Sequence, residues 1–246
     1  MRCIDINCDM GEGMDNDAAL MPYISSANIA CGYHAGNEET MQQTVDLACR
    51  HGVAIGAHVS FWDKENFGRK EMDLPQNAVY ELVQQQLIGL QEIVKMQAVS
   101  IKHVKPHGAL YNMSARDKQL AGTIARAVND LDPSLVLVGL SGSHSINEAK
   151  KLGLQTASEV FADRRYEENG SLRSRSLPGA LLEDAGEVAD QVLQMVSNKT
   201  VISITGKEIP VTAETICIHG DGKHAVEFAQ TIYQNLKNHS IEIKPF

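Results

Sequence analysis

The chain has 246 residues, of which 43% are hydrophobic and 22% charged, and its formal net charge is −9. This length and composition fit one large globular α/β domain, and the acidic charge argues against nucleic acid or an anionic membrane as a general partner. The sequence shows neither a signal-peptide pattern nor a long apolar run, so we expect no membrane segment and a cytoplasmic location. The five cysteines form no C-x-x-C pair, which predicts reduced, buried thiols.

Short apolar runs recur along the chain, and most are followed by a helical pattern. The predicted strands, in chain order, are residues 3–6, 27–31, 53–57, 101–104, 135–140, 154–160 and 215–218. The predicted helices are residues 17–23, 38–51, 75–94, 117–131, 146–152, 184–196 and 225–237. Two further segments, 201–204 and 208–211, predict a small hairpin outside this alternation.

Seven strand-then-helix units predict a parallel sheet with helical crossovers. No strand is followed by G-x-G-x-x-G or G-x-x-x-x-G-K-[ST], so the usual signature of a nucleotide-binding open sheet is missing. We therefore expect a closed (β/α)7 barrel that forms one domain over residues 1–246, with a hairpin excursion near 200–211.

Asp9 and Glu12 follow the first predicted strand in the glycine-rich stretch 7–13. Glycine lets a ligand approach the backbone closely, and the carboxyl ends of strands are where α/β proteins keep their chemistry. Taken alone, the stretch is equally well explained as a solvated turn. The interpretation as a site depends on the same arrangement recurring at later strands.

Polar groups do recur at the end of almost every predicted strand. After Asp9 and Glu12 come His34, His58, Lys105 with His107, Ser141 with Ser143, Glu159 with Asp163 and Arg164, and His219 with Asp221. The carboxyl ends of the strands of a parallel barrel all face one rim, so these side chains should converge. One histidine is usually structural, but four at four strand ends indicate a functional site.

Three kinds of chemistry fit this set of residues. Asp9, His58 and His107 could form a two-histidine, one-carboxylate metal site, although no H-E-x-x-H motif supports it. Without a metal, the same groups could act as general acid and base. Lys105 and Arg69 could hold a carboxylate or a phosphate.

Several segments of the chain resemble the LamB/YcsF family. The matching stretches are residues 5–13, 26–36, 53–58, 67–69, 103–111, 159–164 and 216–221, and the pair 28–36 and 105–111 is the most specific. Two departures are a shorter loop after Gly13 and Val59 at a position where the family generally has proline. The shorter loop concerns the shape of one pocket wall and not the assignment.

The resemblance implies a seven-stranded (β/α) barrel related to the glycoside hydrolase/deacetylase fold. It implies one component of an ATP-dependent 5-oxoprolinase, which opens 5-oxoproline to L-glutamate together with two other subunits, B and C. ATP with Mg²⁺ would act in the assembled complex, because this chain shows no phosphate loop of its own.

The resemblance and the strand-end pattern together give the expected site. The expected catalytic residues are Asp9, His34, His58 and His107. The expected substrate-binding residues are Asn7, Glu12, Asn28, Arg69, Lys105, Glu159, Asp163, Arg164, His219 and Asp221. Two alternatives remain open: a metal-dependent hydrolase resembling carbohydrate deacetylases, suggested by fold alone, and a non-catalytic subunit that only binds 5-oxoproline.

Overall fold

The computed structural model describes residues 2–222 and 224–246. Within these residues, seven parallel strands form a closed barrel, because β1 pairs with both β2 and β9. The barrel strands are β1 (Arg2–Met10), β2 (Ser26–Ala30), β3 (Ala54–Val59), β4 (His103–Pro106), β5 (Val136–Leu140), β6 (Gln155–Phe161) and β9 (Thr215–Ile218). The predicted (β/α)7 barrel is confirmed.

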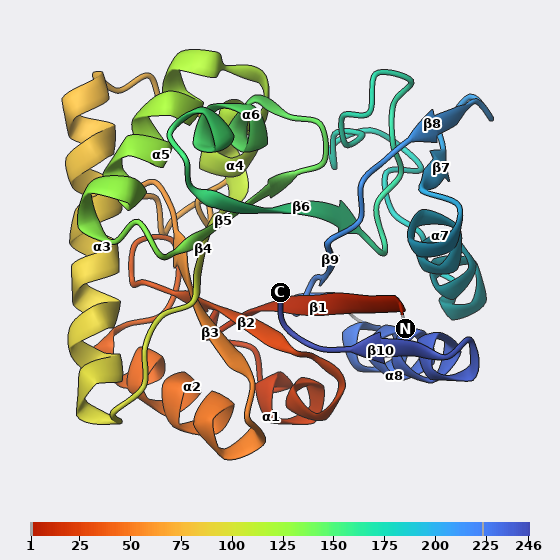
Figure 1. The fold of residues 1–246 in the computed structure, drawn as a ribbon, viewed down its shortest axis with the longest axis horizontal. Coiled ribbons are helices and arrows are strands. Elements are labelled where there is room, and N and C mark those ends of the chain that lie inside the picture. The colour runs from red at the N-terminus through yellow and green to blue at the C-terminus, as the bar shows by residue number, and fades with distance from the viewer. Residues whose placement is uncertain (1, 223) are drawn as a thin grey trace.

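Helices surround the strands (Figure 1). They are α1 (Asp17–Leu20), α2 (Glu38–His51), α3 (Gln76–Met96), α4 (Gly108–Arg116), α5 (Lys118–Leu131), α6 (His144–Lys151), α7 (Ala185–Ser197) and α8 (Ala225–Asn238), and the short 3-10 helix η1 (Met21–Tyr23) follows α1. The predicted start of α2 is correct, since the Asn37 side chain accepts a hydrogen bond from the Thr40 backbone N–H at 2.9 Å. None of the described helices is both long and apolar enough to cross a membrane.

Two elements were absent from the sequence prediction. Helix α4 begins directly after His107, where the prediction placed no helix before residue 117. Strand β10 (Ile241–Ile243) pairs in parallel with the first residues of β1 outside the closed barrel, which brings the two ends of the chain together (Figure 1). Both elements are short, so their apolar patterns are too brief to stand out. The antiparallel pair β7 (Thr200–Ile202) and β8 (Glu208–Pro210) forms a separate two-stranded sheet.

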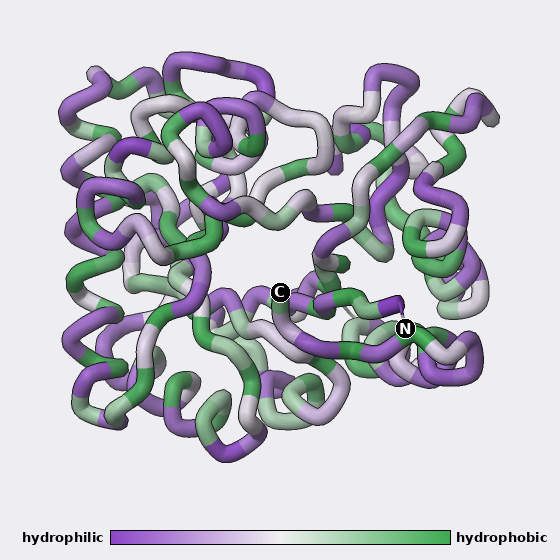
Figure 2. The backbone as a smooth tube through the Cα atoms, in the orientation of Figure 1, coloured by the Kyte–Doolittle hydropathy of each residue, from purple (hydrophilic) through white to green (hydrophobic). Residues whose placement is uncertain are grey.

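Strand β1 is buried on both faces, but its two faces differ in polarity. Ile4, Ile6, Cys8 and Met10 belong to the hydrophobic core, while Asp5, Asn7 and Asp9 alternate with them and are also buried. Because successive side chains of a strand point to opposite faces, one face packs on the helices and the other lines the barrel interior. Along the surrounding helices, hydrophobic and hydrophilic segments alternate, as expected for helices with one buried face (Figure 2).

Candidate active site

The interior of the barrel is a hydrogen-bonded column of polar side chains. Asn7 on β1 donates to Glu159 on β6 at 2.9 Å, although these two strands are not neighbours in the sheet. Asn28 on β2 donates to Asn7 at 2.7 Å and to Oδ1 of Asp9 at 2.8 Å. His103 Nε2 lies 2.8 Å from Asn28 Oδ1, which can only accept, so this nitrogen carries the ring's proton. These bonds cross the barrel and fix its polar groups in place.

Lys105 is the cation of this column. Its Nζ lies 2.9 Å from Asp9 Oδ1 and 2.9 Å from Glu159 Oε1, and it also donates to the Cys217 sulfur at 3.1 Å. Burial alone would lower the pKa of Lys105, but the surrounding Asp9, Cys217 and Glu159 hold it well above its usual range. Lys105 therefore stays charged, and its protons are already taken by partners within the protein.

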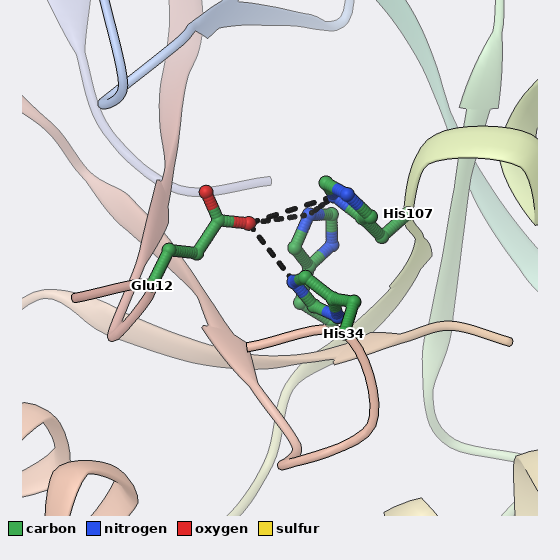
Figure 3. Close-up of side chains that lie close together, drawn as sticks. Glu12, His34 and His107 are labelled. Atoms are coloured by element: carbon green, nitrogen blue, oxygen red, sulfur yellow. Dashed lines mark hydrogen bonds and ion pairs between the residues drawn. The ribbon is translucent and has the colours of Figure 1, made fainter. Parts of the chain in front are cut away.

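A carboxylate and three histidines meet above this column. Oε1 of Glu12 lies 3.0 Å from His34 Nε2, 3.7 Å from His58 Nε2 and 3.5 Å from His107 Nδ1. Figure 3 shows this oxygen directed at the rings of His34 and His107. All four side chains are buried, and they come from the loops or strand ends after β1, β2, β3 and β4.

Two backbone carbonyl groups hold the rings of His58 and His107. His58 Nδ1 lies 2.9 Å from the carbonyl oxygen of Lys105, and His107 Nε2 lies 2.9 Å from that of Phe67. A carbonyl oxygen only accepts, so each of these nitrogens carries a proton. The opposite nitrogens, His58 Nε2 and His107 Nδ1, lie 2.9 Å apart.

Burial shifts the titration of this cluster. Burial and the nearby Asp9 carboxylate raise the pKa of Glu12 to about 8. Burial and His58 lower the pKa of His34 to about 2 and hold the pKa of His107 well below its usual range. Burial would raise the pKa of Asp9, but His58 and Lys105 hold it well below its usual range. The pKa values of two neighbouring carboxyl groups are thus shifted in opposite directions, as in an acid–base pair.

A cavity of about 770 Å³ opens above the cluster. Asp9, Glu12, His58 and His107 line it on the barrel side. Across its mouth, Arg69 forms an ion pair with Asp221 at 2.6 Å, and Arg175 lies 3.6 Å from the same carboxylate. A cavity of this volume can hold a small-molecule ligand.

The remaining rim residues come from the ends of β6 and β9. His219 Nδ1 lies 2.8 Å from Asp163, whose carboxyl pKa is lowered because His219 and two arginines outweigh the effect of burial. Arg164 is 6% exposed and lines the cavity, and its Nε has no hydrogen-bond partner among the described residues. Arg164 is therefore a buried cation at the wall of the cavity, although its Nε itself has no exposed surface.

The structure brings the predicted site residues to one end of the barrel, at two depths. Those that line the cavity are Asp9, Glu12, His58, Arg69, Lys105, His107, Arg164, His219 and Asp221. Those that lie behind the lining are Asn7, Asn28, His34, Glu159 and Asp163. Asn7, Asn28 and Glu159 have no exposed surface, so their bonds position Asp9 and Lys105. Direct substrate contact by these residues stays a prediction.

Among the described residues, two groups have the spacing of a metal site. One is Glu12, His34, His58 and His107, and the other is Asp9, Cys217 and His219. The sequence paired Asp9 with His58 and His107, but the structure puts Glu12 with these histidines, and Asp9 Oδ2 lies 3.4 Å from His58 Nε2 alone. One residue was overlooked as well: Cys217 contacts Lys105, and nothing in its apolar strand distinguished it from an ordinary buried cysteine.

Fold and site together define a closed parallel barrel with acids and histidines gathered at the carboxyl ends of its strands. The LamB/YcsF family profile matches residues 4–246, and the chain belongs to this family. The protein named as the A subunit of 5-oxoprolinase in Staphylococcus carnosus is 51% identical over 245 residues, covering 98% of this chain and 97% of that protein. The protein of the same name from Staphylococcus aureus strain Newman is 50% identical over 246 residues, covering 98% of each.

Solved structures agree with this assignment. The crystal structure of the Lactam Utilization Protein from Thermus thermophilus superposes with a TM-score of 0.94 at 40% identity, covering 100% of each chain. The structure titled "T48 deacetylase with substrate" superposes with a TM-score of 0.51 at 13% identity, covering 99% of this chain and 88% of that one. At such low identity the second likeness concerns the fold alone.

Proposed function

We propose that this chain is the A subunit of an ATP-dependent 5-oxoprolinase, a lactam hydrolase that opens 5-oxoproline to L-glutamate. The observation that carries the proposal is the buried cluster of Asp9, Glu12, His58 and His107 at the floor of the cavity. It lies in a chain about half identical to proteins named for this activity. A subunit that only binds its ligand needs fewer buried acids and bases.

The reaction explains why such a cluster is useful. The carbonyl of a five-membered lactam is a poor electrophile because amide resonance protects it. Phosphorylation of the lactam oxygen by ATP would create a leaving group and a carbon that water can attack. Hydrolysis then needs a base for the water and an acid for the ring nitrogen. Asp9 stays ionised and can orient the attacking water, and Glu12, with its raised pKa, can supply the proton as long as no metal ion is bound to it.

Recognition of the anionic substrate falls to the rim arginines in this proposal. The expectation that Lys105 holds the substrate carboxylate or a phosphate is revised in this proposal, because Lys105 already donates to Asn7, Asp9 and Cys217 and forms an ion pair with Glu159. Arg164 lines the cavity and donates to the backbone oxygen of Arg173, so it is the better cation for this task.

ATP with Mg²⁺ and two partner subunits, B and C, complete the proposal. The chain has no glycine-rich phosphate loop in its sequence, and its relatives are named as one subunit of an enzyme. We expect the ATP step to depend on the assembled complex.

The test is to follow glutamate and phosphate release from 5-oxoproline by the chain alone, by the partners alone and by the mixture, with and without ATP. The expected result is ATP-dependent release of both products by the mixture only. His107→Asn should abolish release, while His51→Asn, at the exposed end of α2, should not change it. Ring opening by the chain alone without ATP would refute the proposal and favour a metal-dependent hydrolase.

A further inference from the structure

We propose that Glu12, His58 and His107 form a binding site for one divalent transition-metal ion, with His34 as the residue that positions Glu12. This site differs from the Asp9, His58 and His107 set that the sequence suggested. It concerns ion binding only, so it holds or fails independently of the proposed substrate.

The first argument is the contact between His58 and His107. Their outer nitrogens donate to the carbonyl oxygens of Lys105 and Phe67, so in neutral rings the two facing nitrogens both carry lone pairs. These nitrogens lie 2.9 Å apart, a distance at which two acceptors repel unless a cation lies between them. Two nitrogens that each lie about 2.0–2.1 Å from one ion at a right angle are also about 2.9 Å apart.

The second argument is the position of Glu12. Its Oε1 lies 3.5 Å from His107 Nδ1 and 3.7 Å from His58 Nε2, so it faces the same point as both lone pairs. One proton can link only two of these three atoms, whereas one metal ion can bind all three. A carboxylate with two histidines is a common catalytic metal set that leaves further positions open.

His34 has a different role within the cluster. Its ring stacks on His107 with centroids 3.9 Å apart and an angle of 9° between the planes. Ligand nitrogens direct their lone pairs within the ring plane, so two stacked, parallel rings do not point at one shared ion. His34 Nε2 instead lies 3.0 Å from Glu12 Oε1, where its N–H can donate and hold the carboxylate in position.

Asp9 is excluded as the third ligand by its own partners. Its Oδ1 accepts from Asn28 at 2.8 Å and from Lys105 at 2.9 Å, and only Oδ2 faces His58, at 3.4 Å. The ammonium of Lys105 beside Asp9 also disfavours a cation there.

Glu12, His58 and His107 line the cavity, so an ion held by them can reach a ligand. Their nitrogen and oxygen donors suit Zn²⁺, Co²⁺ or Ni²⁺. Such an ion polarises a carbonyl group or activates water.

The test is metal binding by the full-length chain after treatment with a chelator and dialysis. Titration with Co²⁺, followed by visible d–d absorption, and metal analysis after Zn²⁺ loading should both give one ion per chain. Glu12→Gln and His107→Asn should each raise the Kd by at least about 100-fold, more than the loss of a supporting residue. His51→Asn, an exposed histidine at the end of α2, is the matched control and should bind like the unaltered chain.

Asp9→Asn separates the two possible sites, because it should keep the ion in this proposal and lose it if Asp9 is a ligand. Circular dichroism checks that each variant folds. If a variant does not fold, the unaltered chain still provides a test, because a bound ion must raise its Tm with ion concentration. Failure of the folded, unaltered chain to bind one ion would overturn the proposal. So would a Glu12→Gln variant with unchanged affinity.

Discussion

The ammonium of Lys105 lies 2.9 Å from the carboxylate of Asp9, and neither side chain is more than 8% exposed. Glu159 lies at the same distance on the other side and has no exposed surface. Charges removed from water at this depth are stable only together, because each alone would bear a large desolvation cost. The site and the stability of the barrel therefore depend on the same group of charges.

Lys105→Met should strongly destabilise the protein. The substitution keeps a similar shape but leaves Asp9 and Glu159 buried without their cation, so we expect the free energy of unfolding to fall by about 3–5 kcal/mol. Urea denaturation followed by circular dichroism measures this change. Lys102→Met, three residues earlier at an exposed position, is the control and should change little. If the two variants had the same free energy of unfolding, the pairing of Lys105 with Asp9 and Glu159 would contribute nothing to the stability of the fold.

Asp9→Asn should affect both stability and turnover. The sequence left a solvated turn around Asp9 as an alternative, and the structure corrects this, since Asp9 is 7% exposed and paired with Lys105. We expect a loss of about 1–3 kcal/mol of stability. In the reconstituted complex, turnover should fall by about 10²-fold or more, as for loss of a general acid–base group. Normal turnover by the folded variant would remove Asp9 from the chemistry.

The Asp9 variant should also be less sensitive to acid. A carboxyl group whose pKa is lower in the folded state contributes stability above its unfolded pKa of 3.8 and loses it as the pH falls through the folded value. Asp9→Asn removes this contribution, so the gap in stability between the two proteins should close below about pH 3.8. Urea titrations at several pH values test this, and a gap that stays constant would contradict it.

His103→Gln should reduce acid sensitivity in a different pH range. Burial, together with Lys105, lowers the pKa of His103 from 6.5 to about 3. Between these values the unfolded chain binds a proton that the folded chain does not, so stability falls as the pH drops from 6.5 towards 3. The variant should lose less stability over this range. His51→Gln, at an exposed position, should retain the slope of the unaltered protein.

Gly56→Ala should be harmful, whereas the same change at Gly89 should not. A Cβ atom at Gly56 would lie 2.0 Å from His103 Nε2, so the ring would have to move and break its bond to Asn28. Such overpacking costs typically about 1–3 kcal/mol. Gly89 lies inside α3 with open space around it, and Ala there should stabilise the helix by up to about 1 kcal/mol. Opposite shifts in Tm are expected, and parallel shifts would refute this explanation.

The sequence was sufficient for the barrel because each strand-then-helix unit has a local pattern. It also placed Asp9, His58 and His107 at strand ends, because that placement depends only on where each apolar run stops in the sequence. It could not tell that Glu12, three residues beyond Asp9, would turn towards the histidines, because that depends on the loop's path. Nor could it show that Lys105 is fully occupied, since Glu159 and Cys217 reach it from distant strands.

The polar column inside the barrel has a consequence for how the site works over time. Solvent dipoles must reorient whenever charge moves during a reaction, but the amides of Asn7 and Asn28 and the ammonium of Lys105 are already oriented by their bonds. The work of arranging them is done once, when the chain folds, and is not repeated in each catalytic cycle. A barrel filled with aliphatic side chains would be easier to fold but would leave this reorganisation to be done at every turnover.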